Sequence, residues 1–154
     1  MNESAGQGEQ GPLRGDIVLG PGEGQTIPGT DAMTLKAPSE DPGGSIGFLE
    51  ATSPPGTGSP RHVHHSCDEL FYVLEGEFLV LVGERQVSAL PGTFVFIPWG
   101  TVYAAKAIGT EPGKVLAAYI PGAWSGASRS SPSCAPSREK TQIGAWGGAG
   151  PWPR

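Results

Sequence analysis

Short apolar runs of five to seven residues recur from residue 69 to residue 120, and turn-forming residues separate them. Glycine, proline or acidic residues fill the breaks at 75–76, 83–84, 91–92, 98–100 and 110–113. No segment shows a sustained helical period. Even spacing with short turns is typical of a closed antiparallel barrel or jelly roll, so an all-β fold is predicted. The predicted strands are Glu69–Leu74, Glu77–Val82, Arg85–Leu90, Thr93–Ile97, Val102–Ala107 and Lys114–Ile120.

The region before residue 61 has a looser pattern. Gly15–Leu19 is predicted as a first short strand, and Met33–Ala37 as an edge strand that ends at Pro38. Ser45–Ala51 is a further predicted strand. Residues 21–24 and 27–30 have the composition of turns.

Composition divides the chain into three parts. Residues 1–13 are mostly polar and are predicted to be a mobile leader, followed by a barrel over residues 14–124. In residues 125–154, Ser, Gly, Pro and Ala make up 19 of 30 positions. Such a segment buries too little apolar surface to offset its ordering entropy, so a disordered tail is predicted.

Charge and cysteine content limit the partners and the compartment. Residues 1–124 hold six Lys and Arg against fourteen Asp and Glu, an acidic balance that argues against a nucleic-acid partner. No apolar stretch has membrane length, and the N-terminus lacks the regions of a signal peptide, which indicates a cytoplasmic protein. In that reducing compartment a disulfide between Cys67 and Cys134 is not expected.

The histidines mark the candidate chemistry. His62 and His64 lie two apart in an extended segment, so their side chains share one face, and Glu69 can turn back toward them from the next strand. Two imidazoles and one carboxylate suit Fe(II), Mn(II) or Zn(II) and leave coordination positions open. The competing interpretation is that both are ordinary strand histidines. By alternation, His65 points away from the site.

These residues carry a family resemblance. The stretch resembles the first cupin motif, G(X)5HXH(X)3-4E(X)6G, with its fixed positions filled by Gly56, His62, His64, Glu69 and Gly76. The second motif, G(X)5PXG(X)2H(X)3N, is matched at Gly92, Pro98 and Gly100, but Tyr103 replaces its histidine and Ala107 its asparagine. The resemblance covers roughly residues 15–124. It implies a double-stranded β-helix (jelly-roll) barrel with a divalent metal in its mouth, either Fe(II), Mn(II), Ni(II), Cu(II) or Zn(II). It also implies a homodimer paired through an exposed barrel edge, for which Met33–Ala37 is the candidate.

Tyr103 has two interpretations. As a phenolate ligand it would add a second negative charge beside Glu69 and favour a trivalent ion, and a ferric site would then be coloured. Alternatively, it only lines the pocket, because a phenol with a pKa near 10 needs a strongly acidic metal to lose its proton. Alternation predicts apolar pocket walls at Phe71, Val73, Phe94, Phe96 and Ala105, with the face of Phe94 and Phe96 left open.

The cupin resemblance and this site together imply three alternative functions. The first is a metal-dependent oxygenase of the quercetin-dioxygenase-like kind, acting on an apolar or phenolic small molecule, with Glu69 and Tyr103 as the candidate catalytic residues. The second is a non-redox cyclase or isomerase of the aromatic polyketide type, in which the metal is a Lewis acid. The third is a small-molecule-binding module without turnover. Fold alone does not choose among them.

Overall fold

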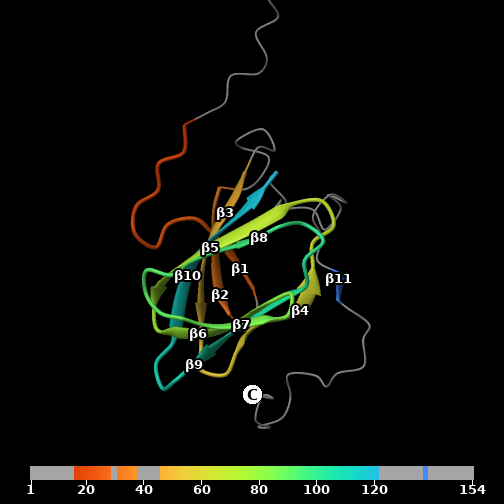
Figure 1. Cartoon of the computed structure of the whole chain (residues 1–154). Helices are drawn as coiled ribbons and strands as arrows, with labels where there is room; N and C mark the ends of the chain where they lie inside the picture. The colour runs from red at the N-terminus through yellow and green to blue at the C-terminus, as the bar shows by residue number, and fades with distance from the viewer. Residues whose placement is uncertain (1–15, 29–30, 38–45, 122–136, 139–154) are drawn as a thin grey trace, which may run out of the picture.

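The computed structural model describes residues 16–28, 31–37, 46–121 and 137–138. In these ranges every regular element is a strand. The described residues include no helix that is long and apolar enough to cross a membrane. The strands form two antiparallel sheets, which confirms the predicted all-β class (Figure 1). In spatial order the six-stranded sheet holds β1 (Gln25–Ile27), β2 (Ala32–Ala37), β3 (Gly47–Ser53), β10 (Gly113–Ile120), β5 (Asp68–Glu75) and β8 (Phe94–Ile97). The five-stranded sheet holds β11 (Ser137–Arg138), β4 (Gly58–Val63), β9 (Tyr103–Ile108), β6 (Glu77–Val82) and β7 (Arg85–Ala89).

The hydrophobic core lies between the two sheets. Strand β3 shows how the sequence builds it, because Leu49, Ala51 and Ser53 are buried while the residues between them are partly exposed. The same alternation on β5 and β6 turns Phe71, Val73, Phe78 and Val80 inward, and β10 contributes Ala117. The core therefore consists of one face from each sheet.

All six strands predicted after residue 68 are present, with boundaries that agree to within two residues. Of the N-terminal predictions, the strand Ser45–Ala51 is present as β3, shifted by two residues, and the other two differ from the structure. Residues 16–19 form no strand, and the side chains of Ile17 and Val18 are exposed. The predicted edge position of Met33–Ala37 is also wrong, because β1 pairs with β2 and covers that edge.

The leader predicted over residues 1–13 lies outside the described residues, as does most of the predicted tail. Within the tail, Ser137 and Arg138 form β11, which pairs with Val63 and His62 at the end of β4.

Cys67 is buried and disulfide-bonded, so the expectation of reduced thiols is wrong for this residue. The chain's other cysteine, Cys134, is outside the described residues. Strand β11 pairs with the end of β4, next to the bend that holds Cys67.

The two glycines that frame the first motif stand at chain reversals. Gly56 and Gly76 have φ angles of 83° and 72°, in the left-handed region that favours glycine. A Cβ on Gly76 would also lie 2.7 Å from the Pro112 carbonyl oxygen and from Gly113 Cα. These turns set the ends of β4 and β5, and thereby the positions of the site residues.

Candidate metal centre

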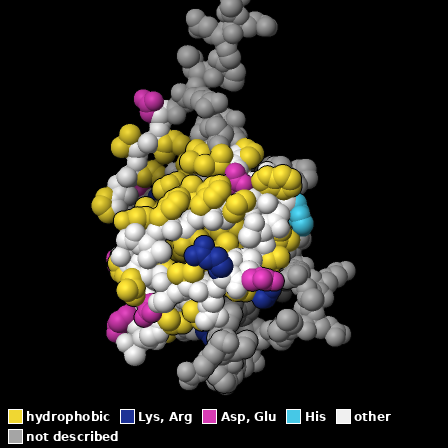
Figure 2. All heavy atoms as spheres, in the orientation of Figure 1, with side chains coloured by type: hydrophobic (Ala, Val, Ile, Leu, Met, Phe, Trp, Pro, Cys, Tyr) yellow, Lys and Arg dark blue, Asp and Glu magenta, His cyan; other side chains and the backbone are white. Residues whose placement is uncertain are grey.

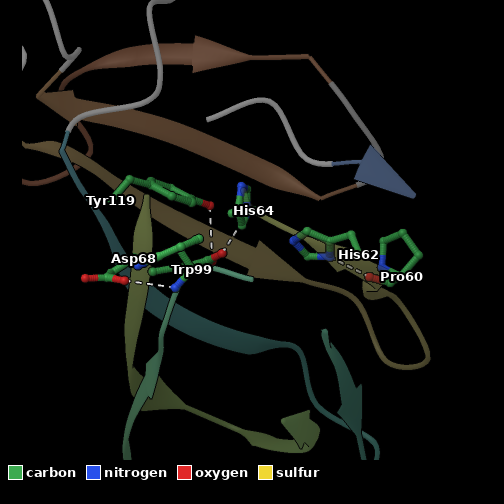
Figure 3. Close-up of polar contacts among 7 residues, drawn as sticks. Pro60, His62, His64, Asp68, Trp99 and Tyr119 are labelled. Carbon is green, nitrogen blue, oxygen red and sulfur yellow. Dashed lines mark hydrogen bonds and ion pairs between the residues drawn. The ribbon is translucent and has the colours of Figure 1, made fainter. Parts of the chain in front are cut away.

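His62 stands near the end of β4 with its side chain buried between the sheets. Its Nδ1 lies 2.6 Å from the carbonyl oxygen of Pro60 (Figure 3). A carbonyl oxygen can only accept, so Nδ1 carries the proton in this contact and Nε2 keeps its lone pair. This arrangement fixes the tautomer and leaves Nε2 ready to bind a metal.

His64 and Glu69 meet across the bend between β4 and β5. His64 Nε2 lies 3.1 Å from Glu69 Oε2, and both side chains are buried. The contact is close but does not have hydrogen-bond geometry, so Glu69 Oε2 accepts no hydrogen bond there. A buried carboxylate oxygen without a donor is costly unless a cation balances it.

One ligand atom from each of His62, His64 and Glu69 lies within 4.8 Å of the others. The structure therefore brings together the three residues that the sequence predicted as ligands, and their donor set fits a divalent metal. His65, the third histidine, is exposed, in agreement with alternation.

Tyr119 is a site residue that the sequence analysis missed. It lies on β10 directly opposite Glu69 on β5, and its hydroxyl donates a hydrogen bond of 3.1 Å to Glu69 Oε1 (Figure 3). Burial, followed by the nearby Glu69 carboxylate, raises the pKa of Tyr119 well above its usual value of 10.0. The phenol is therefore a proton donor at neutral pH. Alternation along Lys114–Ile120 puts Tyr119 and Ala117 on the same face, but only the strand register shows that Tyr119 lies opposite Glu69.

Tyr103 pairs in register with His62, and the centroids of the two rings are 4.3 Å apart. Burial raises its pKa well above 10.0, and the Glu69 carboxylate raises it further. Tyr103 thus stands in the site wall as a protonated phenol, hydrogen-bonded with Glu69 and Ser59. Tyr103 lines the cavity beside the three candidate ligands, and its role as a phenolate ligand stays a prediction.

The ligand atoms open onto a cavity of about 330 Å³ between the sheets. Of the predicted walls, Phe71 and Ala105 line this cavity, whereas Val73 is buried in the core away from it. The remaining lining residues are Asp31, Met33, Leu49, Ala51, Ser53, Gly58, Ser59, Pro60, Phe78, Val115 and Ala117, together with the site residues named above. Among the described lining residues none is Lys or Arg, so the cavity offers no cationic side chain to a phosphorylated substrate.

The assignment of Phe94 and Phe96 to the pocket is wrong. Both side chains are exposed, and neither lines the cavity. The reason is the register of β8 against β5, in which Phe94 is opposite Tyr72 and Phe96 is opposite Leu70. These four side chains share the outer face of the six-stranded sheet, while Glu69 and Phe71 share its inner face.

A sequence model of the family described as cupin domain matches residues 49–119, the segment that holds the three candidate ligands, Tyr103, Tyr119 and most of the other cavity-lining residues. Residues 49–119 form a cupin domain. The double-stranded β-helix that the motif resemblance implied is thereby confirmed, since cupin structures superpose on the chain.

Among known proteins, the cupin domain is similar to an uncharacterized protein from Methanocaldococcus jannaschii, 30% identical over 74 residues. The match covers 48% of this chain and 59% of that relative, so it spans less than two thirds of the curated protein. KdgF from Halomonas sp. superposes with a TM-score of 0.59 and 18% identity, over 70% of this chain and 94% of that one. An RmlC-like cupin from Shewanella frigidimarina superposes with a TM-score of 0.58 and 20% identity, over 69% and 90%. At these identities the structural matches establish the fold alone.

The stability of the metal-free protein should fall as the pH drops below 6.5. Burial lowers the pKa of His62 from its usual 6.5. Just below pH 6.5, His62 is therefore protonated more in the unfolded chain than in the folded protein. This contribution is present above pH 6.5 and is lost as the pH falls toward the folded pKa, with a slope of at most about 1.4 kcal/mol per pH unit. Urea unfolding at several pH values measures it, and His62→Gln should have the shallower slope. Identical slopes in the two proteins would contradict the prediction.

Proposed function

We propose that this cupin domain is a metal-dependent enzyme that oxidises an apolar or phenolic small molecule with O2. The observation that carries the proposal is the convergence of His62, His64 and Glu69 in the wall of a largely apolar cavity. A set of two histidines and one carboxylate leaves coordination positions open for substrate and co-substrate.

A divalent metal held by these three side chains would act as a Lewis acid for an anionic substrate oxygen and, if redox-active, would allow electron transfer to O2. The chain supplies the remainder of the chemistry. The apolar walls, such as Phe71 and Ala105, exclude water and favour an apolar substrate. The Glu69 carboxylate is the group placed to accept a substrate proton, and the protonated phenols of Tyr103 and Tyr119 are placed to donate one.

The second candidate is non-redox cyclisation or isomerisation in the same cavity. It is favoured by the same pair of phenols, because two proton donors beside one carboxylate provide acid and base without an oxidant. The two candidates differ in O2 consumption, which an oxygen electrode measures directly.

The deciding experiment is metal analysis by mass spectrometry of untagged protein purified without chelator. The wild type should hold close to one metal per chain, and the double variant His62→Ala/Glu69→Ala should hold almost none. The metal's identity then separates redox from Lewis-acid chemistry. If both proteins stay substoichiometric after reconstitution, the enzymatic proposal fails, and the third possibility, a binding module without turnover, takes its place.

Tyr119→Phe should weaken metal binding by about 10- to 100-fold, the usual effect of removing a group that orients a ligand. The variant keeps the buried ring but removes the hydroxyl that donates to Glu69 Oε1. Competition with a chromophoric chelator measures the affinity. Tyr72→Phe is the matched control, because it removes a phenol hydroxyl on the outer face of the same sheet. Equal loss in both variants would show that Tyr119 has no specific effect on Glu69.

A further inference from the structure

The cavity lining changes in character along the strands of the six-stranded sheet. The register across β2, β3, β10 and β5 places the lining residues of this sheet in rows that are two residues apart. From the metal site outward, the rows are Tyr119 with Glu69, then Leu49 with Ala117 and Phe71, then Met33 with Ala51 and Val115, and finally Asp31 with Ser53. The candidate metal site and the polar row, Asp31 and Ser53, are therefore separated by two apolar rows.

The polar row is far from the candidate ligands. Ser53 on β3 pairs with Gly113 at the start of β10, whereas Glu69 on β5 pairs with Tyr119 near the end of β10. Gly113 and Tyr119 are six residues apart on one strand, a separation of about 20 Å at the usual rise of a strand. A group bound by the polar row thus belongs to a different part of a ligand from the group that meets the metal.

Asp31 is a half-buried carboxylate that keeps acceptor capacity. It directly precedes Ala32, which pairs with Thr52, so it lies beside Ser53 in the cavity wall. The Thr57 hydroxyl donates to Asp31 Oδ1 over 2.8 Å, and the same hydroxyl lies 2.9 Å from the carbonyl oxygen of Pro54. A hydroxyl has one proton and both neighbours only accept, so Thr57 divides that proton between two acceptors. The Asp31 carboxylate is held in place by this contact and can accept a further hydrogen bond from a ligand.

Ser53 complements the carboxylate, because its hydroxyl can donate as well as accept. Its side chain is 4% exposed and lines the cavity. Lys and Arg side chains lie on the outer surface in the space-filling view (Figure 2), but none of the described lining residues is Lys or Arg. A carboxylate without a cation in the cavity lining disfavours an anionic group.

The polar row matches a neutral hydroxyl group better than an ammonium group. A hydroxyl can donate to Asp31 and accept from Ser53 at the same time. An ammonium has no acceptor for the Ser53 proton, and it would lose its hydration between apolar rows.

We propose that Asp31 and Ser53 bind a hydroxyl group at the far end of an elongated substrate, whose other end presents an oxygen to the metal site. This subsite rests on the proposed function, because it specifies the substrate of the same cavity. The two apolar rows between the ends require an apolar body in the middle of the molecule. Asp31 and Ser53 determine specificity and lie too far from the metal ligands to take part in the chemistry.

Binding of two rigid phenols to the Zn(II)-loaded protein tests the proposal by isothermal titration calorimetry. The first, 4,4′-dihydroxystilbene, has a hydroxyl at each end, and the second, 4-hydroxy-4′-methylstilbene, has a methyl group in place of one hydroxyl. The wild type should bind the first about 10-fold more tightly, because the methyl group leaves the polar row unpaired. This preference should disappear in Asp31→Ala/Ser53→Ala. It should persist in the control Asp16→Ala, which removes an exposed carboxylate outside the cavity lining.

Asp31→Asn separates the charge of the carboxylate from its structural contact. The variant keeps an oxygen that can accept from Thr57, so a smaller preference in it reflects the lost charge. Equal affinity of the wild type for the two phenols, or an unchanged preference in the double variant, would overturn the subsite and leave the proposed function standing. Failure of both phenols to bind would overturn both. A preference for the diol in a protein that takes up no metal would support the subsite while the proposed function fails.

Discussion

Saturating Zn(II) is expected to raise the melting temperature of the protein by about 8–16 °C. A ligand that binds only the folded state stabilises it by about 4 kcal/mol when its free concentration is about 1,000 times the dissociation constant. For a domain of this size, each kcal/mol shifts the melting temperature by about 2–4 °C. The stabilisation is large because His62, His64 and Glu69 are already buried and close together in the folded protein. Metal binding therefore costs little free energy for ordering these side chains.

Differential scanning calorimetry of the metal-free and metal-loaded protein measures the shift. His62→Ala/Glu69→Ala should show almost none of it, because the double variant keeps only one of the three ligands. His65→Ala is the matched control, since it removes an exposed histidine that lies one residue from the site. A shift that His65→Ala reduces as much as the double variant does would indicate nonspecific binding to histidine.

The three ligands were predictable from sequence because their positions depend on local rules. His62 lies in β4 and His64 directly follows the end of that strand, and a short bend returns the chain to Glu69, so nothing distant is needed to bring the three together. Tyr119 lies 50 residues from Glu69 along the chain, and only the register of β10 against β5 places its hydroxyl there. The candidate metal site was therefore predictable from the sequence, while Tyr119, which donates to its carboxylate, was not.

Edges and faces were harder to predict than strands. The six strands after residue 68 follow from short apolar runs and turns, but the inner or outer face of Phe94 and Phe96 depends on pairing with β5. An aromatic run of this kind has the composition of a core strand, and the structure exposes it instead. Likewise, β2 has the pattern of an edge strand, but the three-residue β1 pairs with it, so β1 and β8 are the outer strands of that sheet among the described residues. A sequence pattern therefore predicts which residues share a face of a strand, but the strand pairing decides which of the two faces is buried.

Phe78→Ala is expected to reduce the free energy of unfolding by about 3–5 kcal/mol, the usual cost of truncating a buried aromatic residue. Phe78 on β6 is almost fully buried, packs in the core and forms part of the cavity wall. Its ring lies so close to Gly113 on β10 that a Cβ there would be 2.4 Å from two ring carbons. The ring therefore fills the space between the two sheets, and its removal leaves a void that joins the cavity. Urea unfolding of the metal-free protein measures the loss.

Gly113 provides the second half of a double-mutant cycle. Gly113→Ala alone should destabilise by about 1–3 kcal/mol, because the added methyl group collides with the ring of Phe78. In the Phe78→Ala background the collision partner is gone and the methyl group occupies part of the void, so the same substitution should cost much less. The two changes should therefore be non-additive, with a coupling energy of about 1–3 kcal/mol. Additive costs would mean that the Gly113 backbone itself resists substitution, and that the contact with Phe78 does not set the spacing of the two sheets beside the metal site.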